Sequence, residues 1–264
     1  AEYGMETVGL YSRTVGRNAM NDEFADYAFQ NGTREDFVFE GRVAALIKPF
    51  CPVGDGRWAI YTEYFGAFPS VAEALLAKGF YIARLENSNR WGTDEDQRMR
   101  WRFADYLDKT RGLSHRCIPI GMSCGGLHAI RFAALHPERI AAMYLDAPVV
   151  NLLSCPMGLG RAEKDEAVLA ECLEALGLSR IEMLAYRKHP LDALPVLAIN
   201  GVPVVMLYGN ADRIVPFEEN GALLDRMYRE KNAPLLTIRK EGCGHHPHGL
   251  DKPEIIVDFL LRYT

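Results

Sequence analysis

The sequence predicts an α/β protein with a mostly parallel sheet and helices on both faces. Short apolar stretches alternate with amphipathic helical stretches from about residue 57 to the end of the chain. Such alternation is typical of βαβ units, in which the helices that connect parallel strands cover the sheet. The chain has 264 residues, of which 48% are hydrophobic and 25% charged. This is the composition of an ordinary globular protein, and the length suits one domain with an insertion.

The elements follow in order along the chain. Residues 37–47 favour a β-strand and carry few helix signals, so the first 50 residues are expected to add antiparallel strands at one sheet edge. Later strands are expected at residues 58–65, 80–85, 117–120, 140–145, 203–208 and 235–239. Helices are expected at residues 69–78, 93–109, 124–135, 218–229 and 253–261. Thr93 followed by two acidic residues is a typical helix start.

One segment is too long for a simple connection. About 55 residues separate the strand at 140–145 from the strand at 203–208, whereas a loop in an α/β unit needs about 2–6 residues beside its helix. Helical patterns occupy residues 161–176, 179–188 and 191–199. We therefore expect a single domain over residues 1–264, with residues 151–201 as a helical cap over the carboxyl ends of the strands.

The composition excludes several classes of function. The 30 Lys and Arg residues against 35 Asp and Glu residues leave a net charge of −5 and form no long basic tract, so nucleic acid is not an expected partner. The longest stretches without charge contain Gly and Pro, so no membrane-spanning helix is expected. The six cysteines include no C-x-x-C pair, and no metal or other cofactor is expected.

The start of the chain gives no targeting signal. Ala1-Glu2-Tyr3-Gly4 lacks the basic residues and the apolar stretch of a signal peptide. Irregularly spaced cysteines favour free thiols and hence the cytoplasm, although a signal peptide already removed would leave the same start. No oligomeric state is predicted.

The strongest motif is Gly121-Met122-Ser123-Cys124-Gly125, between an expected strand and an expected helix. This strand–turn–helix context is that of a nucleophile elbow, in which a sharp turn exposes a serine hydroxyl at a helix N-terminus. A side chain at position 121 or 125 would collide with the neighbouring strand or helix. Ser123 is therefore the candidate nucleophile.

A serine hydroxyl needs a base, and the base needs an orienting acid. Asp212 lies in Gly209-Asn210-Ala211-Asp212, directly after an expected strand. The next expected strand is followed by a loop with three histidines, His245, His246 and His248. Because the carboxyl ends of parallel strands meet at one edge of the sheet, these groups can approach Ser123.

Together the three segments resemble the α/β-hydrolase fold family, specifically its serine esterases and prolyl-oligopeptidase-like members. The similarity covers roughly residues 40–264. Members commonly carry G-x-S-x-G, G-x-x-D-x-x-V-P and G-x-G-H, which read here as GMSCG at 121–125, GNADRIVP at 209–216 and GCGH at 242–245. The resemblance implies Ser123 as nucleophile, Asp212 as acid and His245 as base.

Alternatives remain at two of these positions. His246 and His248 compete with His245 for the role of base. Asp146 ends the strand at 140–145, and some members of the family place the acid after that strand.

An oxyanion hole needs two N–H donors. One is expected to be the amide of Cys124, the residue after the nucleophile. Family members often carry His-Gly in the loop that supplies the second, but the matching stretch here is Tyr61-Thr62-Glu63-Tyr64-Phe65-Gly66. The second donor is expected at Glu63 or Tyr64. Expected substrate contacts are Tyr64, Phe65, Asn89, Trp91 and His246.

The predicted function is hydrolysis of a carboxylic ester through an acyl-enzyme on Ser123, with a small-molecule ester as substrate. A small or carbohydrate-linked acyl ester is favoured, because the short cap carries charged stretches that suit a lipid interface poorly. The alternatives are a serine peptidase of prolyl-oligopeptidase-like type, a lyase or perhydrolase on the same fold, and a binding protein that has kept the fold.

Overall fold

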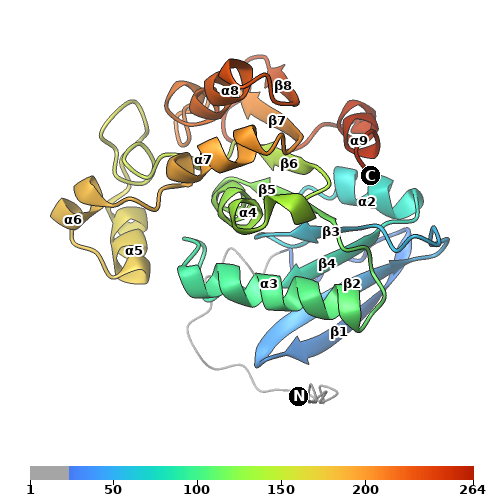
Figure 1. Ribbon diagram of the computed structural model, residues 1–264. Helices are drawn as coiled ribbons and strands as arrows, with labels where there is room; N and C mark the ends of the chain where they lie inside the picture. The colour runs from blue at the N-terminus through green and yellow to red at the C-terminus, as the bar shows by residue number, and fades with distance from the viewer. Residues whose placement is uncertain (1–23) are drawn as a thin grey trace.

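The computed structural model describes residues 24–264, in which one sheet of eight strands runs through the molecule (Figure 1). The strand order is β1-β2-β4-β3-β5-β6-β7-β8. The strands are β1 (Gly32–Phe39), β2 (Arg42–Pro49), β3 (Trp58–Tyr61), β4 (Tyr81–Leu85), β5 (Cys117–Met122), β6 (Met143–Asp146), β7 (Val204–Gly209) and β8 (Leu235–Lys240). Neighbours from β4 to β8 are parallel, whereas β1 pairs antiparallel with β2 and β2 antiparallel with β4. The expected antiparallel edge is thus confirmed.

Helices cover both faces of the sheet. They are α2 (Ser70–Ala77), α3 (Asp94–Lys109), α4 (Cys124–Leu135), α7 (Pro190–Ile199), α8 (Gly221–Glu230) and α9 (Glu254–Leu261). Side chains of α3, α4, α7 and α8 belong to one apolar cluster, and those of α2 and α9 belong to another. Strand β3 shows why two clusters form, because Trp58 and Ile60 face one of them and Ala59 and Tyr61 the other.

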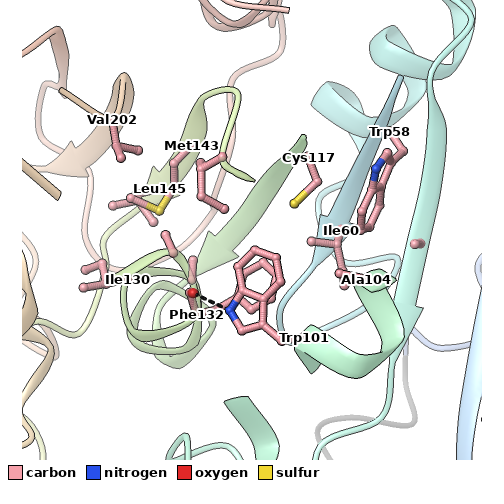
Figure 2. Close-up of a cluster of buried hydrophobic side chains, with 14 of the residues drawn as sticks. Trp58, Ile60, Trp101, Ala104, Cys117, Ile130, Phe132, Met143, Leu145 and Val202 are labelled. Atoms are coloured by element: carbon pink, nitrogen blue, oxygen red, sulfur yellow. Dashed lines mark hydrogen bonds between the residues drawn. The ribbon is translucent and has the colours of Figure 1, made fainter. Parts of the chain in front are cut away.

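Aromatic packing locks α3 against α4 on the first face (Figure 2). Trp101 stacks on Phe132, with ring centroids 4.2 Å apart, and its indole nitrogen donates a hydrogen bond of 2.9 Å to the Phe132 carbonyl. The buried indole therefore keeps a polar partner while its rings fill the core. Because α4 begins directly after the candidate nucleophile, this packing also supports the elbow.

Two helices lie beyond the sheet and its covering layers, α5 (Glu166–Leu176) and α6 (Arg180–Ala185), at the left of Figure 1. Both fall within residues 151–201, the expected cap. The third helix of that segment, α7, packs instead against α4 and α8 and contributes Leu194 and Leu197 to the core beside the sheet. The part of the segment that stands away from the sheet is therefore α5, α6 and the chain around them.

Several expected boundaries are shifted: the strand expected at 37–47 is divided between β1 and β2, the strand expected at 140–145 is Met143–Asp146, and the helices expected at 161–176 and 179–188 are Glu166–Leu176 and Arg180–Ala185. Two further shifts have clear local reasons. The strand expected at 58–65 ends at Tyr61, because positive φ angles at Tyr64 and Gly66 turn the chain into a loop. The helix expected at 218–229 begins at Gly221, after a short 3-10 turn at Phe217–Glu219. Within residues 24–264 every helix is too short or too polar to cross a bilayer. The expectation about Ala1–Gly4 falls outside the described residues.

Candidate active site

Ser123 lies in the sharp turn between β5 and α4, with φ 52° and ψ −121°. This strained backbone conformation is tolerated only where the surroundings hold it. A Cβ on Gly121 would come 2.7 Å from the carbonyl carbon of Gly125, and one on Gly126 would come 2.7 Å from Cα of Pro148. Both distances are too short for real contacts, so the turn requires glycine at these two positions.

A chain of hydrogen bonds connects three of the predicted residues. The Nε2 atom of His245 lies 3.0 Å from Oγ of Ser123, and its Nδ1 lies 2.7 Å from Oδ2 of Asp212. The other carboxylate oxygen of Asp212 accepts 2.9 Å hydrogen bonds from the amides of Ile214 and Val215. These amides hold the carboxylate in place while it faces the imidazole. Residues that are far apart in the sequence thus meet where β5, β7 and β8 end.

The alternative acid, Asp146, contacts a different histidine. Its Oδ1 lies 3.3 Å from Nδ1 of His248, and its Oδ2 accepts a 2.6 Å hydrogen bond from the amide of Gly249 and lies 3.5 Å from Nζ of Lys240. The main-chain oxygen of Asp146 accepts a hydrogen bond from the amide of Ser123. Asp146 therefore joins the elbow to the histidine loop without contacting the histidine that faces Ser123.

Electrostatics keep Asp146 ionised although its side chain is completely buried. Burial alone would raise the pKa of this carboxyl group, but His248, Lys240 and the Gly249 amide outweigh it and hold the pKa below its ordinary value. The third histidine, His246, is more exposed and stacks on Phe68. The structure therefore brings His245 alone of the three histidines into hydrogen-bonding distance of Ser123.

The loop after β3 lies beside the elbow. The Thr62 carbonyl accepts hydrogen bonds from Arg100 (3.1 Å) and Asn87 (2.7 Å). In a planar trans peptide the N–H points opposite to the carbonyl. The amide of Glu63 therefore points away from Arg100, and its nitrogen lies 3.6 Å from where a Cβ on Gly125 would be.

The amide of Tyr64, the other expected donor, makes no hydrogen bond to a backbone group of residues 24–264. The side chain of Tyr64 lies beside the thiol of Cys124, the residue with which α4 begins. Burial, and then Cys124 and Glu63, raise the pKa of Tyr64 well above its usual value, so its phenol stays neutral. All three expected donors, the amides of Glu63, Tyr64 and Cys124, lie around the elbow.

A buried cluster of polar side chains supports this loop, and the sequence reasoning missed it. Arg100, only 1% exposed, donates to the Asn87 amide oxygen, to Oε1 of Gln97 (2.7 Å) and to Nδ1 of His128 (3.2 Å), besides the Thr62 carbonyl. Burial lowers the pKa of Arg100 to about 10, so the guanidinium remains charged at neutral pH. The sequence did contain a signal for this cluster. Arg100 lies on the face of α3 that is buried, between Gln97 and Phe103, and a charged residue on a buried face needs polar partners.

A cavity of about 360 Å³ opens above Ser123. Three expected substrate contacts, Tyr64, Trp91 and His246, line it. Phe65 and Asn89 do not, so their expected substrate role is not supported. Phe65 is buried against Phe29 and Tyr61, and Asn89 uses its side-chain oxygen to accept from the amide of Trp91.

The cap closes part of this cavity through residues that the sequence reasoning did not single out. Cap-segment residues that line the cavity are Cys155, Pro156, Glu163, Lys164, Asp165 and Val168. Arg90, which also lines the cavity, donates hydrogen bonds of 2.9 and 2.5 Å to the two carboxylate oxygens of Glu171 on α5. Trp91 donates to the same carboxylate at 3.1 Å. This pairing ties the cap to the wall of the cavity.

Known proteins were compared with this chain in sequence and in structure. No protein-family model matches the chain. A monoacylglycerol lipase of Mycolicibacterium smegmatis is 24% identical, over 76% of this chain and 87% of that protein. The acylaminoacyl peptidase of Pyrococcus horikoshii shares the fold with a TM-score of 0.65 and 16% identity, over 89% of this chain and 40% of that one.

The puromycin-hydrolyzing peptidase of Mycobacterium tuberculosis matches 94% of this chain and 40% of its own, with a TM-score of 0.63 and 16% identity. The chain has the α/β-hydrolase fold. The lipase relative and the elbow serine beside a histidine together indicate a serine hydrolase. This α/β-hydrolase spans only 40% of the length of the two peptidase chains that it resembles.

Proposed function

We propose that the protein hydrolyses carboxylic esters through an acyl-enzyme on Ser123. The observation that carries this proposal is the hydrogen-bonded chain from Ser123 through His245 to Asp212, which opens into the cavity. Such a chain activates a hydroxyl that would otherwise be a weak nucleophile. In α/β-hydrolases a serine, a histidine and an aspartate arranged in this way carry out acyl transfer.

The reaction then has two halves. His245 Nε2 takes the proton of the Ser123 hydroxyl as Oγ attacks the ester carbonyl, and Asp212 stabilises the resulting imidazolium through Nδ1–H. The amide of Cys124 and one amide of the loop at Glu63 and Tyr64 stabilise the oxyanion. His245 returns the proton to the leaving alcohol. Water then attacks the acyl carbonyl as His245 takes its proton, the bond to Ser123 Oγ breaks to release the acid, and His245 returns the proton to Oγ.

The cavity supports a small acyl group. Its lining is mainly apolar, with Met122, Cys155, Val168 and Ile214 among the side chains. A volume of about 360 Å³ is at the small end for ligand pockets, which range over roughly 300–1,000 Å³. The charged side chains Glu163, Lys164 and Asp165 stand where the cap meets the cavity, and they are compatible with a polar, including carbohydrate-linked, alcohol portion.

Two experiments test this proposal in sequence. A fluorophosphonate probe should label the wild type and should fail to label Ser123→Ala, whereas the control Ser114→Ala, altered at the opposite end of β5, should label normally. Undiminished labelling of Ser123→Ala would overturn the assignment of the nucleophile. Next, p-nitrophenyl esters of two to sixteen acyl carbons should give the highest kcat/KM at short chains.

A serine peptidase is the second candidate function, because the two solved structures described above are peptidases. Aminoacyl p-nitroanilides measured beside the esters discriminate the two reactions. A higher kcat/KM for the anilides would favour the peptidase. Labelling by the probe without turnover of either series would instead favour a lyase or perhydrolase on the same fold.

A further inference from the structure

The loop that carries His245 places three imidazoles around one point of the cavity. The ring centroids of His245, His246 and His248 are 4.9, 5.0 and 4.9 Å apart, and the ring planes are inclined to one another by 73–80°. One nitrogen from each ring lies within 4.8 Å of the other two. All three side chains line the cavity above Ser123. The three rings thus face a shared space that a small ligand can reach.

Two of these imidazoles face a carboxylate through one ring nitrogen, as metal-binding histidines do. In protein metal sites the ring nitrogen that does not bind the metal usually donates its N–H to a carboxylate, which sets the tautomer and orients the ring. Here Nδ1 of His245 faces Asp212 at 2.7 Å, and Nδ1 of His248 faces Asp146 at 3.3 Å. With the proton on Nδ1, each ring keeps its lone pair on Nε2.

The imidazole of His246 can supply the third metal ligand. The ring of His246 lies 4.9 Å from the rings of both His245 and His248, centroid to centroid, so its nitrogens face the same space. His246 is also the most exposed of the three, which leaves its side chain room to rotate. In a tetrahedral site with metal–nitrogen bonds of about 2.0–2.1 Å, the ligand nitrogens lie roughly 3.3 Å apart. The cluster must therefore contract when a metal binds, mainly by movement of His246.

We propose that His245, His246 and His248 form a binding site for a zinc-like divalent cation that reversibly inhibits the enzyme. Three neutral imidazoles prefer Zn²⁺, Cu²⁺ or Co²⁺ over Mg²⁺ or Ca²⁺, which take oxygen ligands. The metal occupies the lone pair of His245 Nε2 that otherwise accepts the Ser123 proton. Binding breaks that hydrogen bond and no covalent bond, and a chelator restores it.

Metal binding itself is independent of the proposed esterase function, whereas inhibition rests on it. The experiment therefore measures the two separately. Chelator-treated protein is titrated with CoCl2, and the visible absorption of tetrahedral cobalt is recorded together with the stoichiometry. In parallel, hydrolysis of p-nitrophenyl acetate is measured with increasing ZnCl2 and then with excess EDTA.

We expect one Co²⁺ per chain with tetrahedral absorption, and inhibition by Zn²⁺ that EDTA reverses. His246→Ala and His246→Gln should each weaken Co²⁺ binding at least tenfold, and Asp146→Asn about 10–100-fold, as expected for loss of a carboxylate behind a metal-bound histidine. The control His136→Ala, at an exposed histidine outside the cluster, should bind as the wild type does.

Absence of Co²⁺ binding, or binding that both His246 variants leave unchanged, would overturn the metal site while leaving the esterase proposal untouched. Co²⁺ binding by a protein without ester hydrolysis would support the site and count against the esterase function. Zn²⁺ inhibition that persists in both His246 variants would show that the inhibitory metal binds elsewhere.

Discussion

The two buried aspartates near the elbow give the sharpest test of the proposed mechanism. Asp212 contacts the histidine that faces Ser123, at 2.7 Å, whereas Asp146 contacts His248. Asp212→Asn keeps the size of the side chain but removes its negative charge. The group that faces Nδ1 of His245 is then either an NH2 donor or an uncharged carbonyl oxygen. In serine proteases the equivalent change reduces kcat by about 10⁴, because it favours the wrong imidazole tautomer. At about 1.36 kcal/mol per tenfold, this corresponds to roughly 5.4 kcal/mol of lost transition-state stabilisation.

Asp146→Asn should lower the stability of the protein more than its activity. The substitution removes the charge that faces His248 and Lys240, and loss of one partner of a buried ion pair costs about 3–5 kcal/mol of stability. Since Asp146 does not contact His245, kcat should fall far less than in Asp212→Asn, by about tenfold at most through displacement of the loop.

The assay is kcat and KM for p-nitrophenyl acetate, with urea unfolding of each variant on the same preparation. We expect Asp212→Asn to lose activity with little loss of stability, and Asp146→Asn to lose stability with at most about a tenfold loss of activity in the folded fraction. A loss of activity of about 10³-fold or more in Asp146→Asn, beside a loss below about tenfold in Asp212→Asn, would show that Asp146 is the acid and refute the reasoning.

Three further predictions concern the surroundings of the site. Gly121→Ala should abolish soluble folding or lower the unfolding midpoint sharply, because its Cβ meets the backbone of the next turn, whereas Gly244→Ala, with open space around its Cβ, should unfold as the wild type does in a thermal melt. Arg100→Met should lower kcat by about 10–100-fold with a smaller effect on KM, because Arg100 positions the Thr62 peptide of the oxyanion loop; an unchanged kcat would remove that role. Burial, with Arg100 nearby, holds the pKa of His128 well below 6.5 in the folded protein, so unfolding takes up a proton below pH 6.5 and stability is lost as the pH falls. His128→Gln should flatten this loss by up to about 1.4 kcal/mol per pH unit in urea titrations at pH 7.0 and 5.5, and an unchanged slope would contradict the buried neutral histidine.

Local patterns were sufficient for most of the fold. Apolar periodicity and the stop signals at glycine and proline placed the parallel strands and most covering helices within a few residues, because each of these elements buries one face against the sheet. The predicted end of β3 and the predicted start of α8 were wrong. The backbone turns at Tyr64 and Gly66, and the short 3-10 turn before Gly221, leave no distinct apolar pattern in the sequence.

The cap segment shows a limit of the same reasoning. Three helical patterns between β6 and β7 suggested one insertion, but α7 packs beside α4 and α8 in the layer against the sheet. Amphipathic spacing shows that a helix has an apolar face. It does not show which surface that face covers, and this surface depends on elements distant in the sequence.

The sequence by itself determined the reactive serine turn and the order of the candidate groups. Small residues around Ser123 and the loops after β7 and β8 are local requirements, so they are visible in the linear chain. Only the tertiary structure separated Asp212 from Asp146 and His245 from its two neighbours, because several loops end at the same sheet edge and the pairing depends on distances of a few tenths of a nanometre. The same folding brought Arg100 behind the oxyanion loop and turned the three imidazoles of one loop toward a shared point, because neither the distant contact nor the orientation of the rings follows from spacing along the chain.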